Sequence, residues 1–304
     1  MSAPPEPSPH SQPRLSRTLT PAQQAGWRED AVRLAGDRLN DAQRDQLAAI
    51  LSASPHLMRA AVQFADDLPV LINGDWAAIL AQAETDWHHS WPAASSDAQL
   101  MTAVRRYRNR SHLAIALAEL FGQTRIDTSW GALTKVAEDA LRGVVSYLLK
   151  DQPAQGSGWV ILGLGKLGAG ELNYSSDIDL IALQDSQVGT AAAGQTKDQQ
   201  NRHFSELTRR LSQLLSQQTE DGFGWRVDFR LRPDPAVTPL CLSTEAAISY
   251  YESIARTWER AAFIRARPIA GDLAVGEQFL AQISAFIWRR NLDYTVLDLS
   301  LIHI

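Results

Sequence analysis

The sequence predicts an α+β protein in which a small sheet lies between two helical regions. Apolar residues recur at three- and four-residue spacing up to about residue 150, which is typical of helices. Short, continuous apolar runs at 158–165 and 177–183 are typical of buried strands. Residues 225–233 then alternate strictly between apolar and charged side chains, which predicts a strand with two different faces.

The region before the sheet is expected to be helical after a disordered tail. Residues 1–20 are rich in Pro, Ser, Thr and Gln, and this composition buries too little apolar surface to offset the entropy of ordering. From residue 21 to 150 the helical period dominates, with two long helices predicted at 97–121 and 128–149. Ser54 and Pro55 are expected to be the cap and the first residue of a helix.

The remaining elements follow from composition and period. Residues 184–200 are small and polar, which predicts a flexible loop. Apolar residues from Phe204 to Leu215 then line one face of a helix that ends before Gly222. Helical spacing returns at 244–266 and at 273–290.

Charge and cysteine content limit the classes of function. The 304 residues include 29 Lys and Arg against 34 Asp and Glu, so the net charge of -5 does not attract nucleic acid or an anionic membrane. The single cysteine, Cys241, cannot form an intramolecular disulfide, which favours the reducing cytoplasm. No signal peptide is recognisable and no run approaches the ~18 apolar residues of a membrane span.

Three carboxylates are the strongest candidates for chemistry. Asp177 and Asp179 stand two apart at the start of an apolar strand, so both side chains project from one face, with Cα atoms ~7 Å apart. Asp228 belongs to the later alternating strand. Carboxylates on neighbouring strands can hold Mg²⁺, which prefers oxygen ligands. A solvent-exposed strand end without a ligand is the alternative explanation for the Asp pair.

Basic residues near these carboxylates suit phosphate. Arg226, Arg230 and Arg232 share one face of the alternating strand, and guanidinium groups match phosphate oxygens. An exposed sheet face balanced by acidic residues would also explain them. Lys166 lies in a Gly-rich turn whose backbone N–H groups can cradle a phosphate, although an exposed loop lysine has the same signature.

The same turn also spells a dinucleotide-binding pattern. Gly163, Gly165 and Gly168 form G-x-G-x-x-G after a strand, and Asp185 follows about 20 residues on. However, residues 166–176 contain two glycines and are short for the crossover helix that such a fold needs. This alternative, an NAD-binding Rossmann protein, also leaves the Asp pair unexplained.

Three separated blocks together resemble one family, the glutamine synthetase adenylyltransferase/adenylyl-removing enzymes of the nucleotidyltransferase superfamily. The blocks are "GLGKLGAGELNYSSDIDLIAL", "WRVDFRLRPDPAVTPLCLS" and "YYESIARTWERAAFIRARPIAGD". The resemblance implies a polymerase-beta-like nucleotidyltransferase core at 151–242, a small mixed sheet with helices. A helical region at 21–150 would precede it and a truncated helical segment at 243–304 would follow. Lys166 departs from the superfamily pattern, which has a small residue there.

The resemblance also implies roles for individual residues. The catalytic residues, which would coordinate two Mg²⁺ ions, are Asp177, Asp179 and Asp228. The residues that would bind nucleotide or phosphate are Gly165, Lys166, Gly168, Ser176, Arg230 and Arg232. The segment "LNYSSDIDL" resembles the N-terminal, adenylyl-removing half of the family. In that half, orthophosphate attacks the adenylylated tyrosine of glutamine synthetase and ADP is released.

The expected partners are therefore glutamine synthetase, ATP or ADP, orthophosphate and a PII-type signal protein, without nucleic acid or membrane. After Asn291 the sequence departs from the family pattern, and we expect a truncated chain. A non-catalytic module that docks on glutamine synthetase or on a regulatory partner is the alternative from another class. The basic run at 105–110 is expected to be a solvated helix face, which does not favour a nucleic-acid polymerase.

Overall fold

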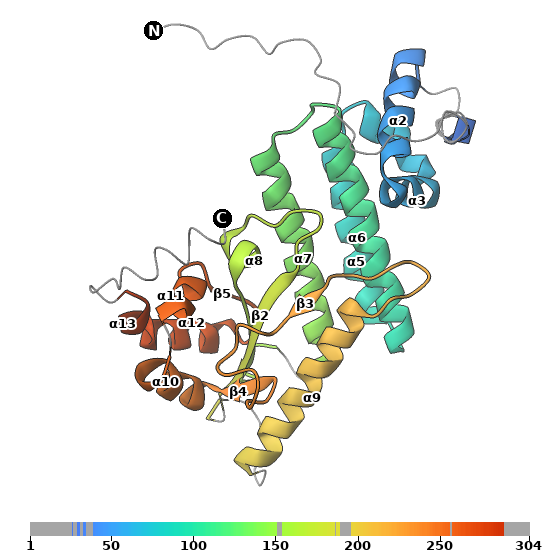
Figure 1. The fold of residues 1–304 in the computed structure, drawn as a ribbon. Coiled ribbons are helices and arrows are strands. Elements are labelled where there is room, and N and C mark those ends of the chain that lie inside the picture. Colours follow the sequence, from blue (N-terminus) through green and yellow to red (C-terminus); the bar gives the residue numbers. More distant parts are fainter. Residues whose placement is uncertain are drawn as a thin grey trace, which may run out of the picture. The chain divides into compact units, whose positions relative to one another are not determined.

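The computed structural model describes residues 39–150, 154–185, 187–188, 196–255 and 257–288, with a few isolated positions between residues 26 and 34 (Figure 1). The predicted tail at 1–20, part of the predicted loop at 184–200 and the end of the chain after residue 288 lie outside the described residues. Two compact units divide the chain, residues 1–80 with 113–125, and residues 81–112 with 126–304. The predicted domain limits at residues 20, 150 and 242 stay predictions, and the units divide the chain differently.

The first unit is built from helices. They are α2 (Asp41–Ala53), α3 (Pro55–Gln63), the short 3-10 helix η2 (Ala65–Asp67) and α4 (Leu68–Ile72). The cap predicted at Ser54 is confirmed, because its Oγ accepts a hydrogen bond from the Leu57 N–H at 3.3 Å and Pro55 is the first helical residue.

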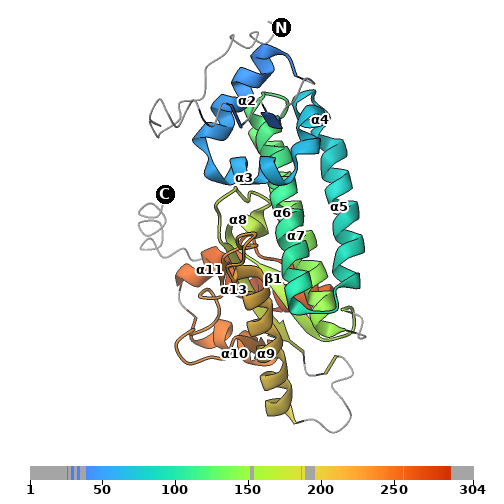
Figure 2. The same ribbon diagram turned by 90° about the vertical axis from the view of Figure 1, so that its right-hand side faces the viewer.

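Both long helices predicted from the period are present. The helices that follow α4 are α5 (Trp76–Ala93), α6 (Asp97–Leu120) and α7 (Ile126–Leu149) (Figure 2). Within the second unit, Trp87 of α5 stacks on Tyr107 of α6 with ring centroids 5.4 Å apart. The indole Nε1 of Trp87 also donates to the carbonyl of Asp139 in α7 at 3.2 Å, so one buried tryptophan joins three helices. Among the described residues, no helix is long and apolar enough to cross a membrane.

The second unit holds the mixed sheet that the sequence predicts. Its strands are β1 (Trp159–Gly163), β2 (Ile178–Gln184), β3 (Val227–Asp228), β4 (Cys241–Ser243) and β5 (Arg267–Gly271). The order is β3-β2-β1-β5, and β4 also pairs with β2. Strand β1 is antiparallel to β2 and to β5, whereas β3 and β4 are parallel to β2. An antiparallel β1–β2 pair excludes the Rossmann alternative, in which these strands would be parallel.

The chain leaves the sheet edge between β3 and β4. Strand β3 pairs with the start of β2, and β4 pairs with its end. The strand predicted over 225–233 is therefore wrong in length, since only residues 227–228 are a strand. The reason is local turn chemistry. The Asp228 carboxylate accepts the backbone N–H of Arg230 at 2.7 Å, and the Phe229 carbonyl accepts that of Arg232 at 3.3 Å, which turns the chain outward.

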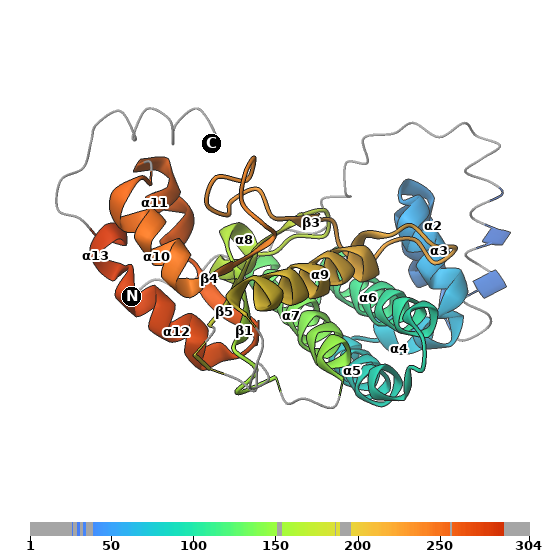
Figure 3. The same cartoon turned by 90° about the horizontal axis from the view of Figure 1, so that it is seen from below.

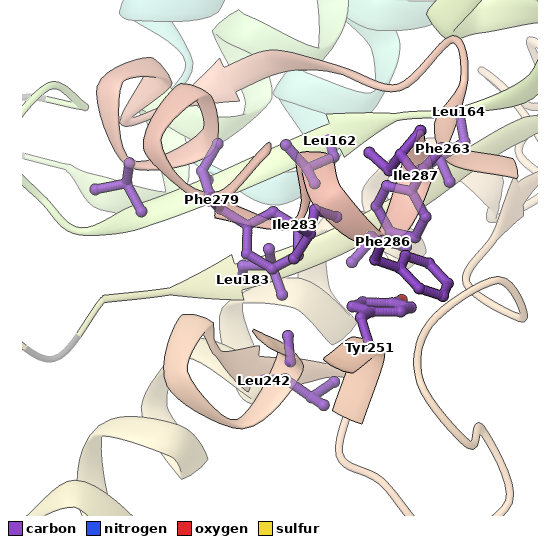
Figure 4. Packing of buried hydrophobic residues seen from close by; sticks show 14 residues of the cluster. Leu162, Leu164, Leu183, Leu242, Tyr251, Phe263, Phe279, Ile283, Phe286 and Ile287 are labelled. Carbon is purple, nitrogen blue, oxygen red and sulfur yellow. The ribbon is translucent and has the colours of Figure 1, made fainter. Parts of the chain in front are cut away.

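Helices cover both faces of the sheet (Figure 3). One face packs against α7 and α9 (Lys197–Ser216), where Phe204 of α9 stacks on Trp159 with ring centroids 6.2 Å apart. The opposite face packs against α10 (Thr244–Ser253), α11 (Thr257–Phe263), α12 (Leu273–Gln282) and α13 (Ser284–Ile287). The core on that side joins Leu162 and Leu183 of the sheet to the rings of Tyr251 and Phe279 (Figure 4).

Strand β5 is an element that the period of the sequence did not reveal. The segment predicted as helical from residue 243 onward contains this strand, which pairs with β1. Its sequence, RPIAG, holds only two buried apolar residues, Ile269 and Ala270. Five residues with an internal proline give too little alternation to identify a strand.

The core on the α10–α13 side predicts a large cost for truncating its central ring. Phe279 is 1% exposed and packs against Tyr251 and Phe263, so Phe279→Ala should lower the free energy of unfolding by about 3–5 kcal/mol, measured by urea denaturation. Leu273 of the same helix is 37% exposed, and Leu273→Ala should cost less than about 1 kcal/mol. Equal losses in the two variants would contradict this packing.

Candidate active site

Strand pairing brings two of the predicted carboxylates together. In the parallel β2–β3 pair, Asp179 is the register partner of Asp228. Asp177 stands two residues before Asp179, at the entrance to β2. Register partners on adjacent strands point to the same side of the sheet, so the fold brings side by side the acidic groups that the sequence selected.

The turn after β1 contacts Asp179 closely. Gly165 begins the short helix α8 (Gly165–Ala169) with a φ of +54°. A Cβ at this position would lie 2.5 Å from Oδ2 of Asp179. The preceding Leu164 N–H donates to the Asp179 carbonyl at 2.9 Å. Gly165 is therefore required for its backbone conformation and for the approach of the carboxylate.

The electrostatic environment of Asp179 is shared by four other charged groups. Burial, followed by the charges of Asp228 and Asp177, raises its pKa to about 6. Arg230 and Lys166 oppose this rise. These five charged groups therefore influence one another, and the negative charge is least favourable on Asp179.

Asp228 shows the opposite shift because it has its own counter-ion. The backbone N–H of Arg230 donates to Oδ1 at 2.7 Å and the guanidinium Nε donates to Oδ2 at 2.8 Å. These bonds hold the pKa of the Asp228 carboxyl below its usual range. The two neighbouring carboxylates are thus driven apart in proton affinity, an arrangement common at functional sites.

Asp177 is paired with a different arginine. The Nε of Arg226 donates to Asp177 Oδ1, and Nη2 donates to the Ser175 carbonyl at 2.5 Å. The side chain of Arg226 is 53% exposed. Asp177 and Asp228 therefore each have one exposed arginine beside them, Arg226 and Arg230 respectively.

The arrangement bears on the predicted Mg²⁺ site. Among the described residues, no three His, Cys, Asp or Glu side chains are gathered into a metal-binding group. Asp177 and Asp228 are instead turned toward Arg226 and Arg230. Their oxygens are nevertheless hard donors of the kind that Mg²⁺ prefers, and a cation would relieve the repulsion that raises the Asp179 pKa. The donor set fits Mg²⁺ in chemistry, and its metal role stays a prediction.

Three other predicted site residues, Lys166, Gly168 and Ser176, lie between β1 and β2. Lys166 is exposed on α8, within electrostatic reach of Asp179. A Cβ on Gly168 would lie 2.3 Å from the carbonyl oxygen of Arg265, so this glycine permits close packing of α8. The Ser176 Oγ donates to Asn173 Oδ1 at 2.8 Å and closes the turn before β2. Their proposed phosphate contacts stay predictions.

Arg232 differs from Arg226 and Arg230 in the groups that it contacts. Its Nη1 donates to the Phe229 carbonyl at 2.9 Å and its Nη2 to the Pro235 carbonyl at 2.8 Å. Burial lowers its pKa. The guanidinium therefore braces the loop between β3 and β4, whereas Arg226 and Arg230 pair with carboxylates. Phosphate binding by Arg232 stays a prediction.

A partly buried arginine that holds α8 was not identified as a site residue from the sequence. Arg267 of β5 donates from Nε to the Gly168 carbonyl at 2.9 Å and from Nη2 to the Leu167 carbonyl at 3.0 Å, and it pairs with Glu138 of α7. It caps the end of α8 and so fixes the turn that contacts Asp179. The third sequence block contains Arg267, which is the first residue of β5, whereas Arg265 lies in the turn before that strand.

The basic run at 105–110 is not a solvated helix face. Arg105 is fully buried and Arg108 is 7% exposed. The guanidinium of Arg105 donates to the carbonyls of Leu214 at 2.8 Å and Gln217 at 2.5 Å, at the end of α9. It thereby anchors the segment that leads from α9 toward β3 and Asp228. A helical period alone could not reveal this, because the acceptors are about 110 residues away.

The raised pKa of Asp179 predicts a pH-dependent stability in metal-free buffer. The folded chain holds a proton here between about pH 4 and pH 6 that the unfolded chain has released, so the contribution to stability falls as pH rises through 6. Asp179→Asn should therefore be more stable than the parent above pH 6, by about 1–2 kcal/mol after allowance for partial exposure, and equal below pH 4. Urea denaturation from pH 4 to 8 measures this.

Glu220→Gln, at an exposed carboxylate, is the control and should leave the pH profile unchanged. A lower stability of Asp179→Asn at pH 8 would mean that the ionised carboxylate stabilises the fold, contrary to this description.

The chain is similar to known proteins over most of its length. The family profile described as glutamate-ammonia ligase adenylyltransferase matches residues 44–282. A protein of Xanthobacter autotrophicus named bifunctional glutamine synthetase adenylyltransferase/adenylyl-removing enzyme is 39% identical, over 97% of this chain and 32% of its own length. The protein of the same name from Rhizobium meliloti is 42% identical, over 84% of this chain and 27% of its own length.

The chain thus spans about a third of the length of the curated relatives it matches. The family match extends over helices of both units and over every strand of the sheet, including Asp177, Asp179 and Asp228. The resemblance stated from the three sequence blocks is therefore confirmed: this chain belongs to the glutamate-ammonia ligase adenylyltransferase family.

Proposed function

We propose that this chain is a Mg²⁺-dependent nucleotidyltransferase that removes AMP from an adenylylated tyrosine of glutamine synthetase by phosphorolysis. The observation that carries the proposal is the register pairing of Asp179 with Asp228, beside the Gly165 turn. This pairing supports a cluster of negative charge in which the carboxylates repel one another unless a cation is bound. Family membership supports adenylyl transfer as the reaction class.

The proposed reaction is an in-line displacement at phosphorus. An oxygen of orthophosphate forms a new bond to the phosphorus of the adenylyl group while the bond to the tyrosine oxygen breaks. The tyrosine takes up a proton and ADP is released. Mg²⁺ bound by Asp177, Asp179 and Asp228 would supply charge neutralisation on the attacking and leaving oxygens.

The basic residues have a distinct part in this proposal. Arg226 and Arg230 now neutralise Asp177 and Asp228, and both side chains are exposed, so they can exchange carboxylate for phosphate oxygens. Lys166 lies within electrostatic reach of Asp179 and suits a nonbridging oxygen of the nucleotide. ATP binding, the cytoplasmic location and regulation by a PII-type signal protein stay predictions from the sequence.

The direct test incubates the purified chain with adenylylated glutamine synthetase, Mg²⁺ and orthophosphate, and measures ADP. A parallel reaction contains unmodified glutamine synthetase and ATP. ADP release alone is the expected result. AMP incorporation would reverse the proposed direction. A folded chain that is silent in both reactions would contradict the enzymatic proposal and favour the docking module.

The carboxylate assignment predicts the effect of neutral substitutions. Asp177→Asn or Asp228→Asn should lower the rate of ADP release by at least about 100-fold, because each removes a ligand charge at the reacting phosphorus, while circular dichroism stays unchanged. Asp185→Asn is the matched control, since Asp185 lies after the far end of β2 and its side chain accepts the Gln187 N–H at 2.9 Å. Full activity in both site variants would contradict the assignment.

A further inference from the structure

Arg108 of α6 is a buried cation with few acceptors. Its residue is 7% exposed, and its Nη1 donates to Asn109 Oδ1 at 3.3 Å. Its Nε is buried without an acceptor, and no carboxylate of the described residues forms an ion pair with it. A guanidinium has five N–H donors, and burying them without acceptors is costly. This group is therefore poised to receive an anion.

Aromatic rings connect Arg108 to Arg226 at the candidate active site. The Cζ of Arg108 lies 5.4 Å from the ring centroid of Phe223 and 5.8 Å from that of Trp225. The Cζ of Arg226 lies 5.9 Å from the same Phe223 ring. The two guanidinium groups thus share one ring, and Arg226 also contacts Asp177.

The charges of this cluster are unbalanced. Burial, together with the charges of Arg226 and Arg105, lowers the pKa of Arg108 to about 10. The carboxylates beside these three arginines are Asp177, bonded to Arg226, and Asp221, within electrostatic reach of Arg105. The aromatic rings exclude water, and electrostatic attraction is stronger where water is excluded. A multivalent anion would therefore bind more tightly here than at an exposed surface.

We propose that Arg108 and Arg226 form a binding site for a phosphate oxyanion beside the candidate catalytic carboxylates. The proposal rests on the proposed function, for which it names the site of one phosphate group. An oxyanion offers several acceptors to the free N–H groups of Arg108, and the half-exposed Arg226 leaves an open side. Free orthophosphate and the phosphates of a nucleotide share this chemistry.

Isothermal titration of the 304-residue chain with orthophosphate, ADP and ATP in Mg²⁺-free buffer tests the site. The variants are Arg108→Met and Arg226→Met, which keep an unbranched side chain against the Phe223 ring but remove the charge. Arg106→Met, at an exposed position of the same helix, is the control. Low ionic strength is used because salt screens the exposed Arg226.

The parent chain should bind orthophosphate, and each of the two variants should weaken binding at least about tenfold, with Arg106→Met unchanged. If only ADP or ATP binds and the same variants weaken it, the phosphate belongs to the nucleotide. If Arg108→Met fails to fold, the exposed Arg226→Met decides alone. Absence of binding of all three ligands to the parent, or unchanged binding in the folded variants, would overturn the proposal.

The ADP-release assay separates this proposal from the proposed function. Charge-dependent phosphate binding without ADP release would support the site and contradict the reaction. ADP release with an unchanged KM for orthophosphate and unchanged nucleotide affinity in both variants would support the reaction and contradict the site.

Discussion

The parallel pairing of β2 with β3 is the constraint on which the site depends. It makes Asp179 and Asp228 register partners, so two carboxylates are held on one side of the sheet despite their repulsion. The raised pKa of Asp179 records that repulsion together with burial, and the arginine beside Asp228 offsets part of it. Because β3 has only two residues, β4 can occupy the same edge of β2 further along. The chain between them then forms the loop that carries Arg230 and Arg232.

Five arginines near the candidate site have two different tasks. Arg105, Arg232 and Arg267 are wholly or partly buried and donate to main-chain carbonyls, at the end of α9, in the β3–β4 loop and at the end of α8. They fix the backbone segments that carry the charged groups, as a planar guanidinium with several donors can do. Arg226 and Arg230 are exposed and pair with carboxylates. Of these five, Arg226 and Arg230 can change partners readily when a substrate binds.

The sequence was informative where period and local chemistry agree. The long helices, the cap at Ser54, and strands β1 and β2 follow from short-range patterns, and the three aspartates were selected from their positions on expected strands. The sequence was misleading where distant segments decide the structure. Strand β5 is too short for a period, the alternation of 225–233 is cut by the turn at Asp228, and the acceptors of Arg105 lie far along the chain. Solvation of a helix face cannot be judged without knowing what packs on it.

The central proposal is that Asp177, Asp179 and Asp228 bind a divalent cation once the exposed arginines release them. Binding of Mn²⁺ to the purified chain, followed by electron paramagnetic resonance, tests this without requiring a protein substrate. The account predicts Mn²⁺ binding by the parent that Mg²⁺ displaces, and loss of that binding in an Asp179→Asn, Asp228→Asn double variant that remains folded. Undiminished binding in the double variant, or none in the folded parent, would contradict it.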